Sequence, residues 1–171
     1  MTRLAVLGQG YVGLPVAMLA VRKGMDVVGI ETDPVRVEQL TSGCSYVEDI
    51  SDDELRAARD SGRYTASADY TAAAGFDVAV VTVPTPLRDA GPDLTFLEQA
   101  ATSLAPLVRP GCTVVVESTT YPGTTQDLVA PILEAGSGLT AGQDFALGFS
   151  PERMSPWRSR FIWPWWIFIV G

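Results

Sequence analysis

Residues 4–13 constrain the fold more than any other part of this chain. An apolar run over 4–7 leads directly into three glycines, Gly8, Gly10 and Gly13, spaced as G-x-G-x-x-G, and then into a helix-like segment. A buried strand, a glycine turn and a helix N-terminus together bind the pyrophosphate of a dinucleotide, because the helix end offers free N–H groups and partial positive charge. In that arrangement Gly8 bends the chain, Gly10 admits the pyrophosphate and Gly13 packs the helix against the strand.

An acidic residue after the second strand supports this interpretation. Dinucleotide-binding units carry such a residue about 20 positions after the glycines, where it accepts hydrogen bonds from the ribose. Here Asp26–Ile30 has the composition of a strand and Glu31 follows it. We expect Glu31 to favour NAD over NADP, since a carboxylate accepts bonds from the 2′-OH and repels a 2′-phosphate. Arg36, one turn into the next helix, would soften that preference.

Charge and missing residue types exclude several functions. The net charge of −8 argues against nucleic acid as the main partner, because binding of phosphate backbones needs a basic face. The chain has no histidine, which excludes Ser-His-Asp and Cys-His catalysis within it, and every histidine metal site. Cys44 and Cys112 lack metal-type spacing, so we expect buried thiols and no metal site. Arg3 and the hydrophobic residues 14–21 resemble a secretion signal, but the glycine turn favours folded structure and a cytoplasmic location.

Alternating strand and helix patterns predict a doubly wound α/β fold. We expect helices over residues 11–23, 33–40, 51–60, 95–108 and 124–135, and strands over 4–7, 26–31, 64–66, 77–83, 113–117 and 145–149. Gly24 should end the first helix, while Asp33, Ser51, Thr95, and Thr124 or Thr125 should cap later ones. These elements predict a mostly parallel, Rossmann-type sheet in the order 3-2-1-4-5-6, forming one domain over residues 1–155.

Four motifs stand where strands of this sheet end, at the edge where open parallel sheets bind ligands. They are GQGYVG at 8–13, VPTPL at 83–87, ESTTYPGTT at 117–125 and SPER at 150–153. In this order they resemble the NAD-binding part of the UDP-glucose/GDP-mannose dehydrogenase family, the nucleotide-sugar 6-dehydrogenases, over about residues 1–155. VPTPL and SPER are most similar to the branch acting on UDP-N-acetylmannosamine or UDP-N-acetylglucosamine. UDP-glucose and GDP-mannose dehydrogenases are the close alternatives.

The resemblance implies oxidation of the C6 alcohol of a nucleotide sugar to a carboxylate with two NAD, in the service of polysaccharide biosynthesis. In such enzymes a cysteine captures the aldehyde as a thiohemiacetal, and water later hydrolyses a thioester. By the same resemblance Thr119 would position a water and Glu152 would act as acid/base near C6, with Glu152 and Arg153 beside the substrate. The residues lining NAD would be Gly8, Gly10, Tyr11, Val12, Gly13, Glu31, Arg36, Thr85 and Thr119.

The chain also departs from the family. The family's catalytic cysteine, in a Gly-rich segment, and its catalytic lysine belong to a central helical region and a second α/β domain that these 171 residues do not include. We therefore expect this chain alone to be inactive. By the same resemblance, a full-length parent would form a homodimer. Residues 156–171 hold all four tryptophans. Within them the apolar stretch 161–170 is too short for a membrane span and is interrupted by Pro164. Residues 165–170 are a candidate edge strand of the family's sheet.

Three interpretations remain open. The chain is the NAD-binding domain of a longer nucleotide-sugar dehydrogenase, a non-enzymatic dinucleotide-binding or interaction module, or part of another NAD enzyme, such as a hydroxyacid or 6-phosphogluconate-type dehydrogenase. The segments at 117–125 and 150–153 favour the first over the third. The partner would then be a nucleotide sugar, with neither nucleic acid nor a membrane involved.

Overall fold

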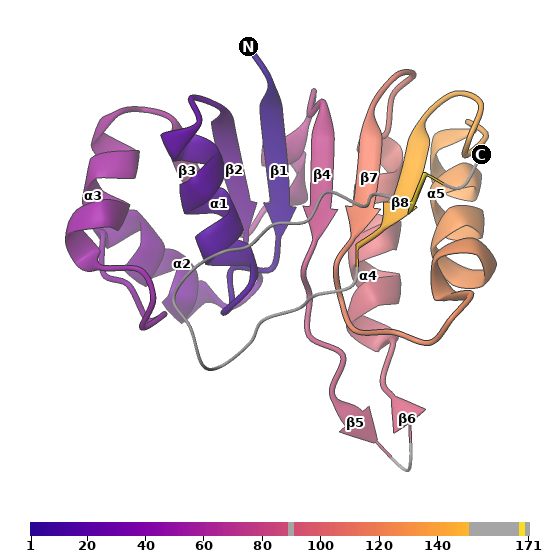
Figure 1. The fold of residues 1–171 in the computed structure, drawn as a ribbon, viewed down its shortest axis with the longest axis horizontal. Helices are drawn as coiled ribbons and strands as arrows, with labels where there is room; N and C mark the ends of the chain where they lie inside the picture. Colours follow the sequence, from indigo (N-terminus) through magenta and orange to yellow (C-terminus); the bar gives the residue numbers. More distant parts are fainter. Residues whose placement is uncertain (89–90, 151–167, 170–171) are drawn as a thin grey trace.

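A parallel sheet forms the centre of the molecule (Figure 1). The computed structural model describes residues 1–88, 91–150 and 168–169, and within them the sheet has seven strands, of which six are parallel and the last, at one edge, is antiparallel. In spatial order the strands are β3 (Tyr64–Ser67), β2 (Asp26–Ile30), β1 (Arg3–Leu7), β4 (Val78–Val81), β7 (Thr113–Val116), β8 (Ala146–Phe149) and β9 (Phe168–Ile169). The order of the six parallel strands confirms the predicted 3-2-1-4-5-6 arrangement and the doubly wound fold. β9 falls within the predicted edge strand over 165–170.

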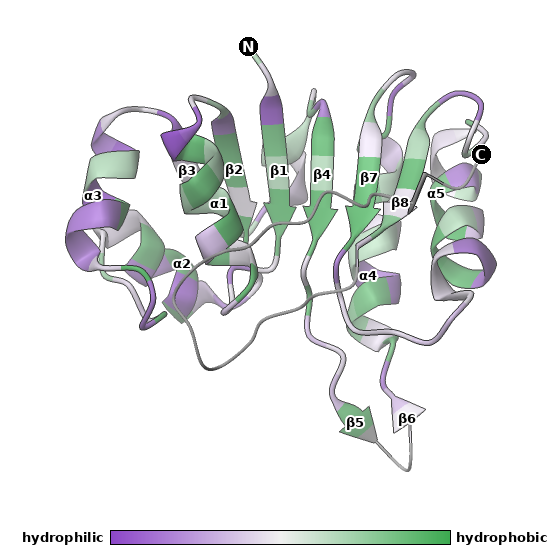
Figure 2. Ribbon diagram, in the orientation of Figure 1, coloured by the Kyte–Doolittle hydropathy of each residue, from purple (hydrophilic) through white to green (hydrophobic). Residues whose placement is uncertain are grey.

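Helices cover both faces of this sheet. α1 (Gly13–Arg22), α2 (Pro34–Ser42) and α3 (Asp52–Asp60) share one buried cluster with the sheet, while α4 (Thr95–Leu104) and α5 (Ala130–Ser137) share the other. Successive residues of β1 enter different clusters, because neighbouring side chains of a strand point to opposite faces. This alternation explains why the central strands are apolar along most of their length, as Figure 2 shows.

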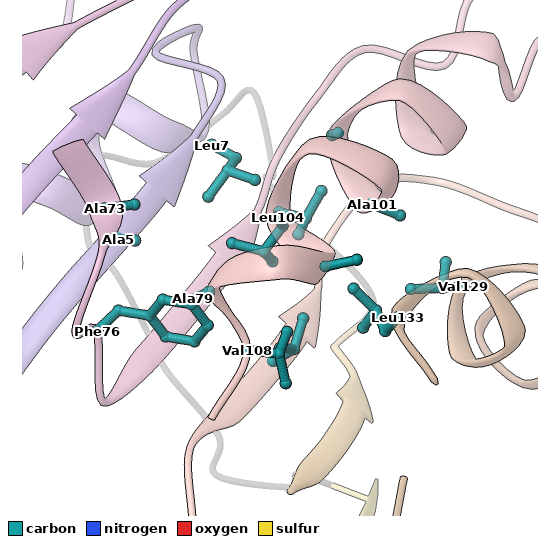
Figure 3. Close-up of a cluster of buried hydrophobic side chains, with 14 of the residues drawn as sticks. Ala5, Leu7, Ala73, Phe76, Ala79, Ala101, Leu104, Val108, Val129 and Leu133 are labelled. Carbon is teal, nitrogen blue, oxygen red and sulfur yellow. The ribbon is translucent and has the colours of Figure 1, made fainter. Parts of the chain in front are cut away.

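The layer beneath α4 and α5 fixes the two strands that matter most for the site, β4 and β7. Phe76, Leu104 and Leu133 have no exposed surface and fill the space between these helices and the sheet (Figure 3). Burial of each such side chain contributes about 1.5–3 kcal/mol. Val81 and Val116, the last residues of β4 and β7, belong to the same cluster, so the carboxyl ends of both strands are held by a packed core.

Two predicted helix caps are present. Asp33 accepts hydrogen bonds from the N–H groups of Val35 and Arg36 at the start of α2, with Pro34 in the first turn. Ser51 accepts a bond from the N–H of Glu54 at the start of α3. The polar residues before these two helices therefore determine where each begins.

The predicted caps of the later helices are wrong. Leu94 holds the cap position of α4 and makes no side-chain cap bond, whereas Asp93 accepts bonds from the N–H and hydroxyl of Thr95. Neither predicted threonine caps the last helix. Thr124 makes no side-chain cap bond, and Thr125 begins a π-helical turn, η3 (Thr125–Val129), that leads into α5.

One segment differs from the predicted helices, and some short elements lie outside the predicted ones. A short 3₁₀ turn, η1 (Tyr70–Ala73), lies between β3 and β4. α4 ends earlier than predicted and continues as a 3₁₀ turn, η2 (Ala105–Leu107), because Pro106 lacks the N–H that an α-helix would use. Between β4 and α4 the chain forms a short antiparallel pair, β5 (Leu87–Arg88) and β6 (Gly91–Pro92), which projects beyond the strand ends in Figure 1.

Candidate functional site

A crevice of about 950 Å³ opens at the carboxyl ends of β1, β2, β4 and β7. The chain leaves β1 toward β2 on one side, and β4 lies on the other side, so the crevice sits where the strand order reverses, the position at which doubly wound folds bind ligands. The predicted cofactor residues that line it are Gly8, Gly10, Tyr11, Val12, Glu31, Arg36, Thr85 and Thr119.

The three glycines of the turn are needed for different reasons. Gly8 has a φ of 89°, and its N–H donates to the carbonyl of Ile30 at 2.8 Å. A Cβ on Gly13 would lie 1.8 Å from the Gly8 carbonyl oxygen, so α1 can pack against the turn only without a side chain there. A Cβ on Gly10 would meet no atom within 4 Å. Nothing in the described fold requires glycine at position 10, but a ligand approaching the backbone would.

The N-terminus of α1 is prepared for an anion. Val12, at its cap position, makes no side-chain cap bond, and the first turn contains no acidic residue. The first N–H groups of such a helix lack intrahelical partners and carry partial positive charge. Tyr11 and Val12 line the crevice at this end, so a phosphate lying against Gly10 would meet these N–H groups.

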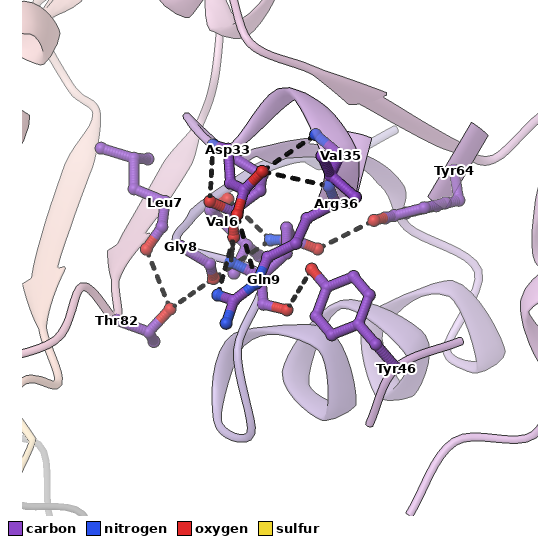
Figure 4. A network of polar contacts seen from close by, with 11 residues as sticks. Val6, Leu7, Gly8, Gln9, Asp33, Val35, Arg36, Tyr46, Tyr64 and Thr82 are labelled. Atoms are coloured by element: carbon purple, nitrogen blue, oxygen red, sulfur yellow. Dashed lines mark hydrogen bonds and ion pairs between the residues drawn. The ribbon is translucent and has the colours of Figure 1, made fainter. Parts of the chain in front are cut away.

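Glu31 lies at the end of β2 with both carboxylate oxygens held by the backbone. Oε2 accepts from the N–H of Gln9 at 3.2 Å, and Oε1 accepts from the N–H of Asp33 at 3.1 Å. Figure 4 labels both donor residues, Gln9 and Asp33, within the surrounding polar network. Only 8% of the residue is exposed, yet it lines the crevice. Each oxygen has further lone-pair capacity, which the hydroxyls of a ribose could use.

Arg36 lies over this part of the crevice. Its guanidinium is 3.8 Å from Glu31 Oε2 and 3.9 Å from Asp33 Oδ2, and it stands 5.2 Å from the centroid of the Tyr46 ring. Burial, and secondly the charge of Glu31, raise the pKa of Tyr46, so its hydroxyl stays protonated and donates to the carbonyl of Gln9 at 2.8 Å.

Gln9, directly behind the crevice, is one of the residues that the sequence did not single out. Its side chain is fully buried behind the glycine turn, with Nε2 donating to the carbonyl of Val6 at 2.9 Å and of Gly8 at 3.3 Å. Its Oε1 accepts from the hydroxyl of Tyr64 at 2.8 Å. The available signal was Gly29 in β2, which leaves space for this amide: a Cβ there would lie 2.6 Å from its Cδ and Oε1.

Side-chain hydroxyls join the loops on the other side of the crevice. Thr82 Oγ1 donates to the carbonyls of Leu7 and Gly8, at 2.9 and 2.8 Å, which ties β4 to the glycine turn. Thr85 Oγ1 donates to the carbonyl of Thr119 at 2.6 Å, and Ser118 Oγ donates to that of Val83 at 2.7 Å. One hydroxyl from the loop after β4 and one from the loop after β7 therefore hold these two loops together. Glu152 and Arg153 lie outside the described residues.

The two cysteines have different surroundings, and neither lines the crevice. Cys112 is buried, as predicted, at the amino end of β7, and burial raises the pKa of its thiol. The prediction that Cys44 is buried is wrong, because it lies exposed in the loop after α2, where Gly43 at the end of that helix turns the chain in a left-handed conformation.

The part of the chain that the structure describes contains no cluster of three or more cysteine, aspartate or glutamate side chains placed to hold a metal ion. None of the helices there has the length and apolar character needed to cross a bilayer.

The fold and the crevice define a dinucleotide-binding domain of the Rossmann type. Residues 2–159 match the family described as "UDP-glucose/GDP-mannose dehydrogenase family, NAD binding domain". The chain belongs to this family, and the cofactor of the domain is NAD. The residues present suit it, since Gly10 leaves the backbone open, α1 has an uncapped N-terminus and Glu31 faces the crevice.

Named relatives are enzymes that act on nucleotide sugars. The chain is 38% identical over 155 residues to UDP-N-acetyl-D-glucosamine 6-dehydrogenase of Salmonella typhi, covering 90% of this chain and 36% of the relative. The solved UDP-D-ManNAc dehydrogenase of Pyrococcus horikoshii superposes with a TM-score of 0.85 at 36% identity, covering 91% of this chain and 37% of that one. The solved ternary complex of GDP-mannose dehydrogenase from Pseudomonas aeruginosa superposes with a TM-score of 0.84 at 30% identity. The match covers 90% of this chain and 37% of that one. The chain thus spans little more than a third of these relatives.

Proposed function

We propose that this chain is the NAD-binding part of a longer nucleotide-sugar 6-dehydrogenase, which oxidises the C6 alcohol of a UDP-N-acetylhexosamine to a carboxylate with two NAD. The observation that carries the proposal is the crevice itself, where the glycine turn and the loops after β4 and β7 converge. Relatives named for UDP-N-acetyl-D-glucosamine and UDP-N-acetyl-D-mannosamine support the choice of sugar. UDP-glucose and GDP-mannose are the alternative substrates.

Within this proposal the chain's own residues bind and orient NAD. The N-terminus of α1 holds its pyrophosphate and Glu31 holds its ribose, and NAD, when bound, serves as the hydride acceptor. Thr119, fixed through its carbonyl by Thr85, would position a water at the edge of the crevice. Glu152 would serve as acid/base, with Arg153 beside the sugar, a role that rests on the family resemblance.

The proposal includes inactivity of the chain on its own. A covalent route through a thiohemiacetal needs a reactive thiolate beside the substrate. Cys112 is buried at the opposite end of β7 from the crevice with a raised pKa, and Cys44 does not line the crevice. The nucleophile would therefore come from the rest of a full-length parent, which we place in the cytoplasm as a homodimer.

An assay of the parent tests the proposal. The gene extended past Gly171 should encode a Gly-rich segment with a cysteine, and its product should form two NADH per UDP-N-acetylhexosamine. Faster turnover of UDP-glucose or GDP-mannose would transfer the assignment to those substrates. An extended gene without such a cysteine, whose product binds NAD but oxidises no nucleotide sugar, would favour a non-enzymatic binding module.

A variant of the parent tests the role of Glu152. General acid/base help is worth about 10²–10⁴ in rate, so Glu152→Gln should slow thioester hydrolysis while leaving NAD affinity nearly unchanged. A covalent sugar–enzyme adduct should then accumulate and be visible by mass spectrometry of the quenched reaction. Turnover at the rate of the unmodified parent, with no adduct, would make Glu152 a solvated surface carboxylate.

A further inference from the structure

The glycine turn contains a buried polar side chain whose purpose the fold alone does not explain. Gln9 has no exposed surface, and three of its polar atoms bond to three different parts of the protein. Its amide nitrogen donates back to the end of β1, its amide oxygen accepts from Tyr64 in β3, and its backbone carbonyl accepts from Tyr46 in the loop after α2. An apolar side chain would fill the same space without needing partners, and burying an amide costs free energy unless its bonds are made.

The surrounding residues are matched to this amide. A Cβ on Gly29, in the middle of β2, would lie 2.6 Å from Gln9 Cδ and Oε1 and 2.8 Å from the hydroxyl of Tyr64. Burial raises the pKa of Tyr64, so its hydroxyl remains a donor to the amide oxygen. One interlocking group therefore spans two strands and the turn. It consists of Gly29, Tyr64 and Gln9, and we call it the Gln9 clamp.

The clamp holds the side chain of Gln9, and two further bonds hold its backbone at the peptide that leads into the anion-binding end of α1. The N–H of Gln9 donates to Glu31 and its carbonyl accepts from Tyr46. A peptide unit is planar, so fixing the Gln9 carbonyl also fixes the direction of the Gly10 N–H. Gly10, Tyr11 and Val12 follow directly and line the crevice.

We propose that Gln9 is a positioning residue that sets the glycine turn in the conformation that receives the pyrophosphate of NAD. Gln9 and Gly29 do not line the crevice, and Gln9 acts through the backbone of the residues that do. Holding a binding loop in its bound conformation before the ligand arrives lowers the cost of binding. The proposal concerns the cofactor loop and is independent of which sugar a parent enzyme oxidises.

Two ligands distinguish positioning from general stability. ADP-ribose carries the pyrophosphate, whereas adenosine does not. We expect Gln9→Met to weaken ADP-ribose binding about tenfold, by loss of a preorganised loop, while adenosine affinity changes less than about twofold. Isothermal titration calorimetry of the 171-residue chain gives the dissociation constant for ADP-ribose, and an NMR titration gives that for adenosine.

Further variants act on the clamp without touching the crevice. Gly29→Ala places a methyl against the amide and should reproduce the split between the two ligands. Tyr64→Phe removes one hydroxyl and leaves the bond to Val6, so it should fold even where the others do not and weaken ADP-ribose binding about threefold. Leu55→Ala is the matched control, because Leu55 is fully buried in the same layer and should lower the melting temperature without changing either affinity.

Equal weakening of adenosine and ADP-ribose by the clamp variants would overturn the proposal, since it would show a general loss of structure. An unchanged ADP-ribose affinity in Tyr64→Phe and Gly29→Ala would overturn it too. A loss of ADP-ribose affinity in Leu55→Ala as large as that in the clamp variants would also overturn it.

Discussion

Replacing Gly10 or Gly13 by alanine should separate the stability of the glycine turn from its binding function. At Gly13 the new methyl would lie 1.8 Å from the Gly8 carbonyl oxygen and 2.5 Å from Thr82 Oγ1. The carbonyl belongs to the backbone and cannot rotate away, so the helix must move off the turn. Overpacking of this kind costs about 3 kcal/mol. For a domain of this size that cost lowers the melting temperature by roughly 6–12 °C.

At Gly10 the same substitution meets open space. No atom lies within 4 Å of the added methyl, and Gly10 does not have a positive φ, so alanine fits the backbone without strain. The free energy of unfolding should therefore change by less than about 0.5 kcal/mol. The methyl would instead occupy the approach of the pyrophosphate. We expect NAD affinity to fall about 100-fold, equivalent to about 2.8 kcal/mol.

Urea unfolding followed by circular dichroism measures the first effect, and calorimetric titration with NAD measures the second. Each variant serves as the control for the other, because only Gly13→Ala should unfold early. The reasoning would be refuted by a Gly10→Ala protein that binds NAD as tightly as the unmodified chain. A stability loss in Gly10→Ala comparable with that of Gly13→Ala would equally contradict it.

Three further predictions follow from individual residues. The chain should bind NAD more tightly than NADP, because Glu31 repels a 2′-phosphate, and tighter binding of NADP in calorimetry would contradict the assignment. The pure chain should produce no NADH from any UDP-sugar; steady production abolished by Cys112→Ser would show that the catalytic thiol is misplaced here. Hydrogen bonds from the N–H of Arg3 and then from the guanidinium of Arg109 lower the pKa of Asp77. The carboxylate therefore stabilises the fold at pH values above its unfolded pKa of about 3.9, and this stabilisation is lost as the pH falls through the lower folded pKa. Asp77→Asn should therefore be less stable than the unmodified chain at pH 7, and urea titrations should show the difference shrinking below about pH 4.

Features encoded by neighbouring residues could be predicted from the sequence. At the cap of α2, the Asp33 carboxylate accepts a hydrogen bond from an N–H two residues later. At the cap of α3, the Ser51 hydroxyl accepts one from an N–H three residues later. The positive φ of Gly8 follows from its place between a strand and a helix. Such local signals predicted where the strands end. Because parallel strands end at a common edge of the sheet, they also predicted the position of the crevice.

Features that depend on contacts between distant segments could not be predicted. Gln9 is fully buried only because Gly29 and Tyr64, from two neighbouring strands, leave it space and supply a partner. A polar residue in a glycine turn gives no local sign of that burial. The π-helical turn before α5 also escaped prediction. Pro131 lacks an N–H, which favours such a widened turn just before it, but the sequence alone does not fix where the extra residue is accommodated.

A crystal structure of the chain with NAD tests the central claim most directly, that the crevice is the cofactor site. The pyrophosphate should lie against the backbone of Gly10, Tyr11 and Val12, and the adenosine ribose hydroxyls should bond to Glu31. The Gln9 amide should keep its bond to Tyr64, because the turn is already in its binding conformation. NAD bound elsewhere, or a glycine turn rebuilt on binding with Gln9 released to solvent, would contradict the account.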